Sequence, residues 1–182
     1  MALTEEGTYA LGQESGSLLL KTSRTGLGRK AGHDLTIEAT RWSASVTIAP
    51  TDPARSSVAV EVEVDALEVR EGTGGVLPLG DSDRSEIKKN LRKVLQADRH
   101  PTITFRSTRV QGTPEEFTVE GDLTITGTTR TVTVRATADG DRVHGGTTVV
   151  QTDFGIKPYS AFFGALRLAD EVDVAFDLTF PD

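Results

Sequence analysis

The sequence predicts an all-β protein with a single helix. Apolar and polar residues alternate along many short segments, and Gly- or Asp-containing turns separate these segments. Alternation with a period of two is typical of antiparallel strands that have one buried face and one solvated face. Many short strands joined by short turns favour a meander that closes into a barrel or folds into a sandwich.

The alternation is clearest in two segments, residues 58–65 and 171–180. Four valines at even positions share one face of the first segment, and Val172, Val174, Phe176, Leu178 and Phe180 share one face of the second. Further strands are predicted at residues 17–22, 35–39, 42–48, 102–109, 117–125, 129–136 and 143–152. Gly127 and the Asp139-Gly140-Asp141 stretch lie where hairpin turns are expected between the later strands.

One segment, residues 83–96, has a different period. Its apolar residues recur at helical spacing, at Ile87, Leu91, Val94 and Leu95. Asp83 and Glu86 form a capping pair at its expected start, and Pro101 ends the helix and begins the next strand. We expect this amphipathic helix to cover one end or one wall of a barrel, with residues 71–75 as a flexible lead-in.

Length, charge and composition set the broad class of protein. The chain has 182 residues, and it has no internal repeat and no interdomain linker, which predicts one domain over residues 1–182. A net charge of -7 argues against a nucleic-acid partner. The absence of Cys excludes disulfides and thiolate metal sites. Without a signal-like start or a long apolar run, a cytoplasmic protein with no integral membrane association is expected.

The familiar signatures of enzymes and metal sites do not occur in the sequence. Residues 26–32 resemble a dinucleotide-binding glycine motif, but a strand-like segment follows them instead of the helix that such a motif requires. His33, His100 and His144 are not spaced as metal ligands. We therefore expect no catalytic residue, no metal and no cofactor. An enzyme that uses His33 on an apolar substrate is the least favoured alternative.

Two segments are candidates for binding. Arg24, Arg29, Lys30 and His33 form the densest positive cluster in this acidic chain. They would either hold an anionic headgroup or form a solvated loop. Residues 154–164 gather aromatic side chains without clean alternation, which indicates a loop or a short helical turn. This apolar loop would either plug the core of a barrel or line the entrance of an apolar pocket.

Five stretches of the sequence form a recognisable series. They are Gly32-His33-Asp34-Leu35, residues 87–95, residues 100–108, residues 121–129, and Asp153-Phe154-Gly155-Ile156 with Asp170-Glu171-Val172. In their order and spacing, over about residues 9–180, the chain resembles the YceI-like family of lipocalin-like, polyisoprenoid-binding proteins. The Gly-aromatic pair of the family's early motif is represented here by Arg41-Trp42.

This resemblance implies an eight-stranded antiparallel lipocalin-like barrel with one helix and an elongated internal cavity. It also implies a long apolar ligand, such as an isoprenoid quinone or a polyprenyl phosphate. An eight-stranded barrel is just wide enough for packed side chains or for one slim ligand. The expected ligand-binding residues are Trp42, Phe105, Phe154, Phe162 and Phe163, with Arg24, Arg29, Lys30 and His33 for a headgroup. The alternative is a barrel with a filled core that acts as a structural or interaction module. In either case the chain could form a homodimer.

Overall fold

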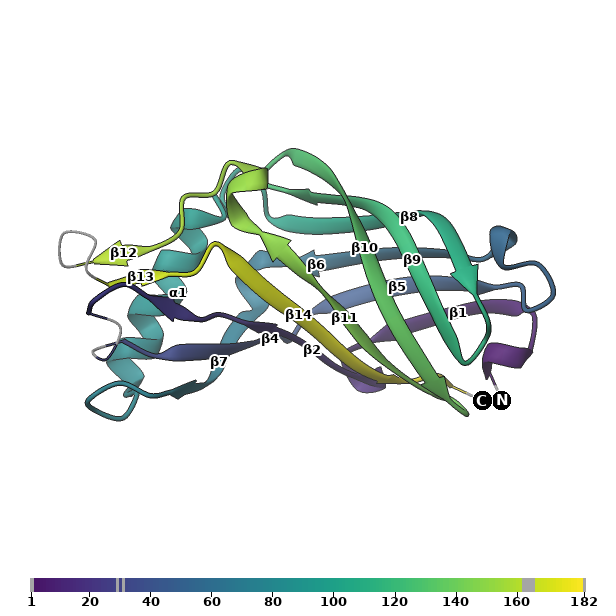
Figure 1. Ribbon diagram of the computed structural model, residues 1–182, viewed down its shortest axis with the longest axis horizontal. Helices are drawn as coiled ribbons and strands as arrows, with labels where there is room; N and C mark the ends of the chain where they lie inside the picture. Colours follow the sequence, from purple (N-terminus) through teal and green to yellow (C-terminus); the bar gives the residue numbers. More distant parts are fainter. Residues whose placement is uncertain (1, 29, 31, 162–165, 182) are drawn as a thin grey trace.

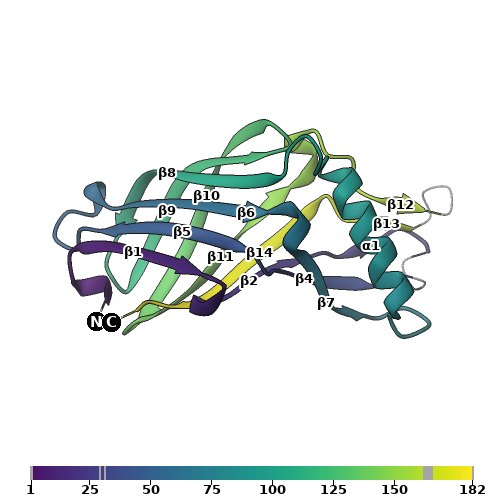
Figure 2. The same cartoon turned by 180° about the vertical axis from the view of Figure 1, so that it is seen from behind.

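The fold is a long antiparallel sheet that curls around one interior, as the computed structural model shows for residues 2–28, 30, 32–161 and 166–181 (Figure 1). The sheet has eleven strands in the order β1-β5-β6-β8-β9-β10-β11-β14-β2-β4-β7. A second sheet of three short strands, β12-β13-β3, lies at one end of the molecule. The two chain termini lie at the opposite end (Figures 1 and 2).

The predicted strands are all present, with ends that shift by at most three residues, whereas β1, β7 and the three strands of the small sheet were not predicted. The main sheet contains β1 (Gly7–Gly12), β2 (Gly16–Lys21), β4 (Asp34–Ala39), β5 (Trp42–Ile48), β6 (Ser57–Glu63), β7 (Leu67–Thr73), β8 (Thr102–Gly112), β9 (Glu116–Ile125), β10 (Thr128–Asp139), β11 (Arg142–Val150) and β14 (Glu171–Thr179). The small sheet contains β3 (Arg24–Thr25), β12 (Ser160–Ala161) and β13 (Leu166–Leu168). Short 3₁₀ turns occupy Ala2–Thr4, Gln13–Ser15, Pro53–Arg55, Val64–Ala66 and Gln151–Phe154.

The expected count of eight strands is not met, because three runs of extended chain are interrupted part-way. β1 and β2 are separated by the turn Gln13–Ser15, β6 and β7 by the turn Val64–Ala66, and β4 and β5 by two residues. At each interruption the chain bends and exchanges its neighbours in the sheet, so that β1, β5 and β6 lie at one edge and β2, β4 and β7 lie at the other. These six segments correspond to three bent paths.

The helix α1 (Asp81–Val94) begins and ends two residues earlier than expected. The residue before its first turn is Gly80, whose N–H donates to Oδ2 of Asp83 at 2.8 Å, so Asp83 is the third residue of the helix and not its cap. Glu86 instead pairs with Lys89 on the helix surface at 3.7 Å. The helix lies across the end of the curled sheet that is remote from the termini (Figure 2). Its Arg84 donates to the carbonyl of Val69 in β7 at 2.6 Å, which fixes it to the sheet.

The hairpin between β9 and β10 shows how local sequence sets the register. Ile125 is paired with Thr128, which leaves Thr126 and Gly127 as a two-residue loop. Both have positive φ, 51° and 75°, as a type I′ turn requires. Glycine adopts this conformation without the steric cost of a Cβ atom, which explains Gly127.

Across β11 and β14, Arg142 forms a bidentate pair with Asp177, with nitrogen-to-oxygen distances of 2.8 and 2.5 Å. The hydrogen bond from Arg142 holds the pKa of the Asp177 carboxyl below its ordinary value. Replacing Arg142 by Gln is expected to raise this pKa, and carboxyl-carbon NMR over a pH titration would measure it. Because the folded-state pKa is lowered, the pair stabilises the fold above pH ~4 and this contribution is lost as the pH falls. An unchanged pKa in Arg142→Gln would contradict the pairing.

No helix among the described residues is both long enough and apolar enough to cross a membrane.

Candidate functional site

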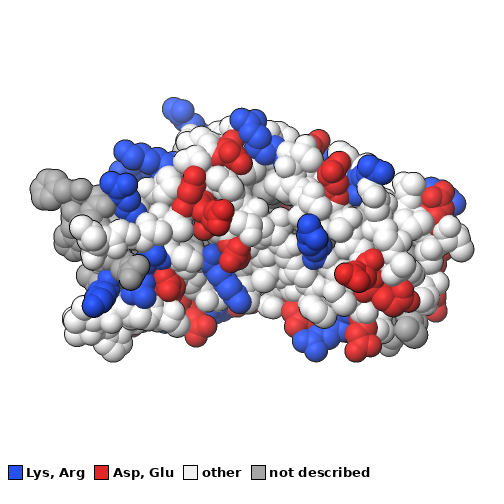
Figure 3. All heavy atoms as spheres, viewed as in Figure 1, with Lys and Arg blue, Asp and Glu red and all other residues white. Residues whose placement is uncertain are grey.

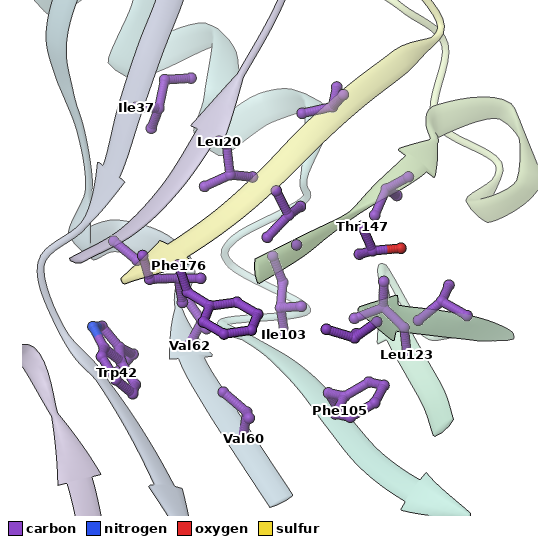
Figure 4. Close-up of a pocket in the computed structure, with 18 of the residues that line it drawn as sticks. Leu20, Ile37, Trp42, Val60, Val62, Ile103, Phe105, Leu123, Thr147 and Phe176 are labelled. Atoms are coloured by element: carbon purple, nitrogen blue, oxygen red, sulfur yellow. The ribbon is translucent and has the colours of Figure 1, made fainter. Parts of the chain in front are cut away.

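The interior of the curled sheet holds a large apolar cavity. Its volume is about 860 Å³. Residues from every strand of the main sheet line it, together with one face of α1. Figure 4 shows apolar side chains from several strands converging on this space. A volume of this size is typical of sites that enclose a small molecule. Within the described part of the chain the barrel is therefore hollow, which does not favour a filled core.

The walls of the cavity are the apolar faces that the alternation predicts. Val58, Val60 and Val62 of β6 line the cavity, and their outward neighbours do not. The large apolar residues of β14, Val172, Val174, Phe176 and Leu178, also line it, as does Phe180 just after the strand. The fourth valine of the first alternating segment, Val64, lies instead in a 3₁₀ turn, where it is 3% exposed and packed away from the cavity.

The two ends of the cavity differ in their polar lining. At the end covered by α1, the lining includes Arg24, His33, Asp83, Glu86 and Asn90. At the end near the chain termini, the polar lining residues are uncharged, at Thr47, Ser56, Gln111 and Thr113. The long middle section presents mainly aliphatic and aromatic side chains. An amphiphilic molecule would therefore place its tail in the middle and a charged or strongly polar group toward the helix.

Two members of the predicted basic cluster, Arg24 and His33, lie at this mouth. Arg24 donates to Oδ1 of Asp34 at 3.1 Å and also to the carbonyl of Gly32, and its side chain is mostly buried at 19% exposure. Nε2 of His33 is 2.8 Å from the carbonyl oxygen of Leu77. Lys30 is exposed and does not line the cavity, and Arg29 lies outside the described residues. Of the three described members of the expected headgroup cluster, the structure thus places two in the lining of the mouth.

The segment 74–80, between β7 and α1, covers part of the same mouth. Val76, Leu77, Pro78 and Leu79 line the cavity, although Val76 and Leu77 are also 77% and 74% exposed to solvent. The contact between His33 and Leu77 ties this segment to the residue before β4. Sequence reasoning missed these residues, because it assigned the neighbouring glycines to a flexible lead-in and no periodic pattern marks the segment.

Of the predicted aromatic contacts, Trp42 and Phe105 line the cavity. Trp42 is 8% exposed, and its buried Nε1 has no hydrogen-bond partner among the described residues. In Figure 4 the indole lies beside Val62 and Phe176, so Trp42 adds ring surface to the wall of the cavity. Phe105 lies on the opposite side of the close-up and contributes a ring to the wall.

The ring of Phe105 has room because Gly121 lies beside it on β9. A Cβ atom at position 121 would lie 2.5 Å from Cζ of Phe105 and 2.5 Å from the carbonyl oxygen of Arg106. We expect Gly121→Ala to destabilise the protein by about 1–3 kcal/mol, measured by urea unfolding. Gly7→Ala is the matched control, because its Cβ would meet nothing closer than 3.5 Å. Equal stability of both variants would contradict the close packing.

Phe154 has a different place from the one expected. It is 2% exposed and packs in a second core cluster with Ile125, Val149 and Ile156, and it does not line the cavity. The reason is the 3₁₀ turn Gln151–Phe154, which is held to the β9–β10 hairpin because Oγ1 of Thr126 donates to the carbonyl of Phe154 at 3.0 Å. Phe162 and Phe163 lie outside the described residues. From the same aromatic segment, Tyr159 does line the cavity.

Comparison with known proteins gives consistent matches. A family model described as the YceI-like domain matches residues 19–180. A UPF0312 protein of Pseudomonas aeruginosa is 33% identical over 105 residues, which cover 51% of this chain and 53% of that protein. A UPF0312 protein of Azotobacter vinelandii is 31% identical over 112 residues, which cover 54% and 56% of the two chains. The matches thus span about half the length of these curated relatives.

Two solved structures share the fold. The crystal structure of BcnA from Burkholderia cenocepacia has a TM-score of 0.63 and 20% identity, and the match covers 88% of this chain and 94% of BcnA. The YCEI protein of Campylobacter jejuni has a TM-score of 0.60 and 13% identity, with 80% and 84% covered. At such low identity the likeness concerns the fold alone.

Proposed function

The chain belongs to the YceI-like family, and from this premise we propose that it binds one long-chain isoprenoid or similar amphiphilic lipid in its cavity. The observation that carries the proposal is the cavity of about 860 Å³, which has a long apolar middle and a charged mouth at one end. The role of the protein would be to carry or sequester the ligand. We propose binding alone, without a chemical step.

Burial of the tail supplies enough free energy for tight binding. Each buried CH₂ contributes roughly 0.8 kcal/mol, so a tail of about fifteen carbons offers a gross gain on the order of 10 kcal/mol. The loss of translational, rotational and tail freedom offsets part of this gain. The polar end of the ligand would lie near Arg24 and His33, where N–H groups accompany the carboxylates of Asp83 and Glu86. Contacts there would orient the ligand more than they would tighten its binding.

The proposal is tested by mass spectrometry of an organic extract from natively purified protein. We expect a prenyl or other long-chain species in about equimolar amount. The purified protein would then be stripped and incubated with a mixture of isoprenoid quinones, polyprenyl phosphates and fatty acids, and the retained species identified. A protein that carries no lipid from the cell and retains none from this mixture would contradict the proposed function.

A further inference from the structure

The exposed apolar side chains of this protein gather at one place. Among the described residues, four large apolar side chains are strongly exposed: Leu27 at 99%, Val76 at 77%, Leu77 at 74% and Tyr159 at 42%. Together these four residues are called the collar below. All four lie around the mouth of the cavity at the end covered by α1, and none lies at the end near the chain termini.

The contacts of neighbouring residues place the collar at this mouth. Leu27 follows β3, whose Arg24 is paired with Leu168 of β13. Leu168 in turn donates its N–H to the carbonyl of Tyr159 at 2.9 Å. Leu77 is joined through its carbonyl to His33, on the strand side of the same opening. In Figure 1 the small sheet, α1 and the end of β7 lie together at the left.

The collar is continuous with the interior. Val76, Leu77 and Tyr159 are exposed to solvent, and the same three residues line the cavity. An apolar tail that leaves the cavity at this end would pass over them before it reached water. Isolated exposed apolar residues are common on proteins, but a group of them at the opening of an apolar cavity marks an interaction site.

Exposed cations flank one side of the collar. Lys30 is close in sequence to Leu27, Lys157 is two residues from Tyr159, and Arg167 is paired with Thr25 in the small sheet. All three are exposed, and Lys and Arg side chains are visible at this end of the molecule (Figure 3, left). Asp81 and Asp83 lie beyond segment 74–80, at the start of α1, so the positive side is the one that carries β3 and β13. This concentration of cations occurs in a chain with a net charge of -7.

From this arrangement we propose that the collar docks on the surface of an anionic lipid bilayer, so that the ligand passes between bilayer and cavity without crossing water. This inference rests on the proposed function. Apolar side chains on separate loop tips with cations beside them fit a headgroup layer, into which single side chains insert while Lys and Arg meet anionic lipids. A stable protein dimer uses about 20–30 residues a side, far more than the collar offers.

The test is co-sedimentation with vesicles. The protein is mixed with vesicles of phosphatidylcholine and phosphatidylglycerol in equal parts, and with vesicles of phosphatidylcholine alone. We expect binding to the mixed vesicles that weakens as salt is added. Leu27→Ser combined with Leu77→Ser should lower the partition constant at least about tenfold. Lys157→Glu should lower it roughly five- to tenfold, and Arg55→Glu, an equal charge change at the opposite end, by less than about twofold.

Ligand binding is measured separately, in solution without vesicles, for each variant. Leu27→Ser alone and Lys157→Glu, whose side chains do not line the cavity, should bind ligand as the parent does, which also shows that they are folded. A parent that binds ligand but not the mixed vesicles would overturn the docking proposal and leave the proposed function standing. Vesicle binding without ligand binding would overturn the proposed function and leave the docking of the collar on the bilayer standing. If Leu27→Ser combined with Leu77→Ser dissociates a homodimer of this chain and leaves vesicle binding unchanged, a second copy covers the collar and the docking proposal is wrong.

Discussion

Val60→Trp is expected to abolish ligand binding while the protein stays folded. Val60 lies on the inward face of β6, next to Ala44 and Phe105 on the neighbouring strands, and its side chain faces the cavity (Figure 4). An indole at this position would occupy the middle of the space that the tail requires. We expect the dissociation constant for a long-chain isoprenoid alcohol to rise at least about 100-fold, which corresponds to about 2.8 kcal/mol.

The stability of Val60→Trp decides how this result is interpreted. Inserting extra volume into a filled core costs about 1–3 kcal/mol, but here the new side chain enters an empty cavity, so a smaller loss is expected. Glu61→Trp is the matched control, because Glu61 is the adjacent residue of the same strand, is exposed, and faces outward. It should leave affinity unchanged. Equal loss of affinity in both variants would show that the cavity is not the binding site.

Phe154→Ala is expected to cause the largest loss of stability among single substitutions outside the cavity. Phe154 is 2% exposed within a cluster that ties the turn Gln151–Phe154 to β9 and β11. Truncation of a buried Phe typically costs about 3–5 kcal/mol, because the lost transfer free energy is added to the cost of a cavity. For a chain of this size the melting temperature should fall by roughly 6–20 °C. Thermal unfolding followed by circular dichroism would measure it.

The same substitution separates core packing from ligand contact. Because Phe154 does not line the cavity, folded Phe154→Ala protein at low temperature should bind ligand with nearly the parent's affinity. Phe105→Ala is the counterpart, since its ring faces the cavity and it should lose affinity with a smaller loss of stability. If Phe154→Ala weakened binding as strongly as Phe105→Ala, Phe154 would contact the ligand, as the sequence predicted, and its placement outside the cavity would be wrong.

The walls of the cavity could be predicted from the sequence, because a strict period of two fixes which side chains share a face. β6 and β14 illustrate this, since their even-numbered apolar residues all face inward until β6 ends at Glu63. β1 was missed because glycines occupy both its ends and leave too few alternating residues to recognise. β7 was missed because its second half is charged and its pairing with β4 contains an irregularity at Thr36 and Ile37.

The emptiness of the interior could not be predicted in this way. The alternation predicts which face of each strand points inward. It does not predict whether side chains from opposite strands pack against one another, because that depends on how tightly the sheet curls. The place of Phe154 depends on a tertiary hydrogen bond from Thr126, and the place of segment 74–80 depends on the contact between His33 and Leu77. Neither contact leaves a local pattern in the sequence, so the mouth was predicted only in part.

The central claim is that the cavity holds the apolar tail of a ligand, and a chain-length series tests it most directly. Binding of unbranched fatty alcohols of increasing length would be measured by calorimetric titration. We expect one ligand per chain and a binding free energy that improves by up to about 0.8 kcal/mol for each added CH₂, until the cavity is full and the gain stops. Affinity that does not depend on chain length, or binding that Val60→Trp leaves intact, would contradict the claim.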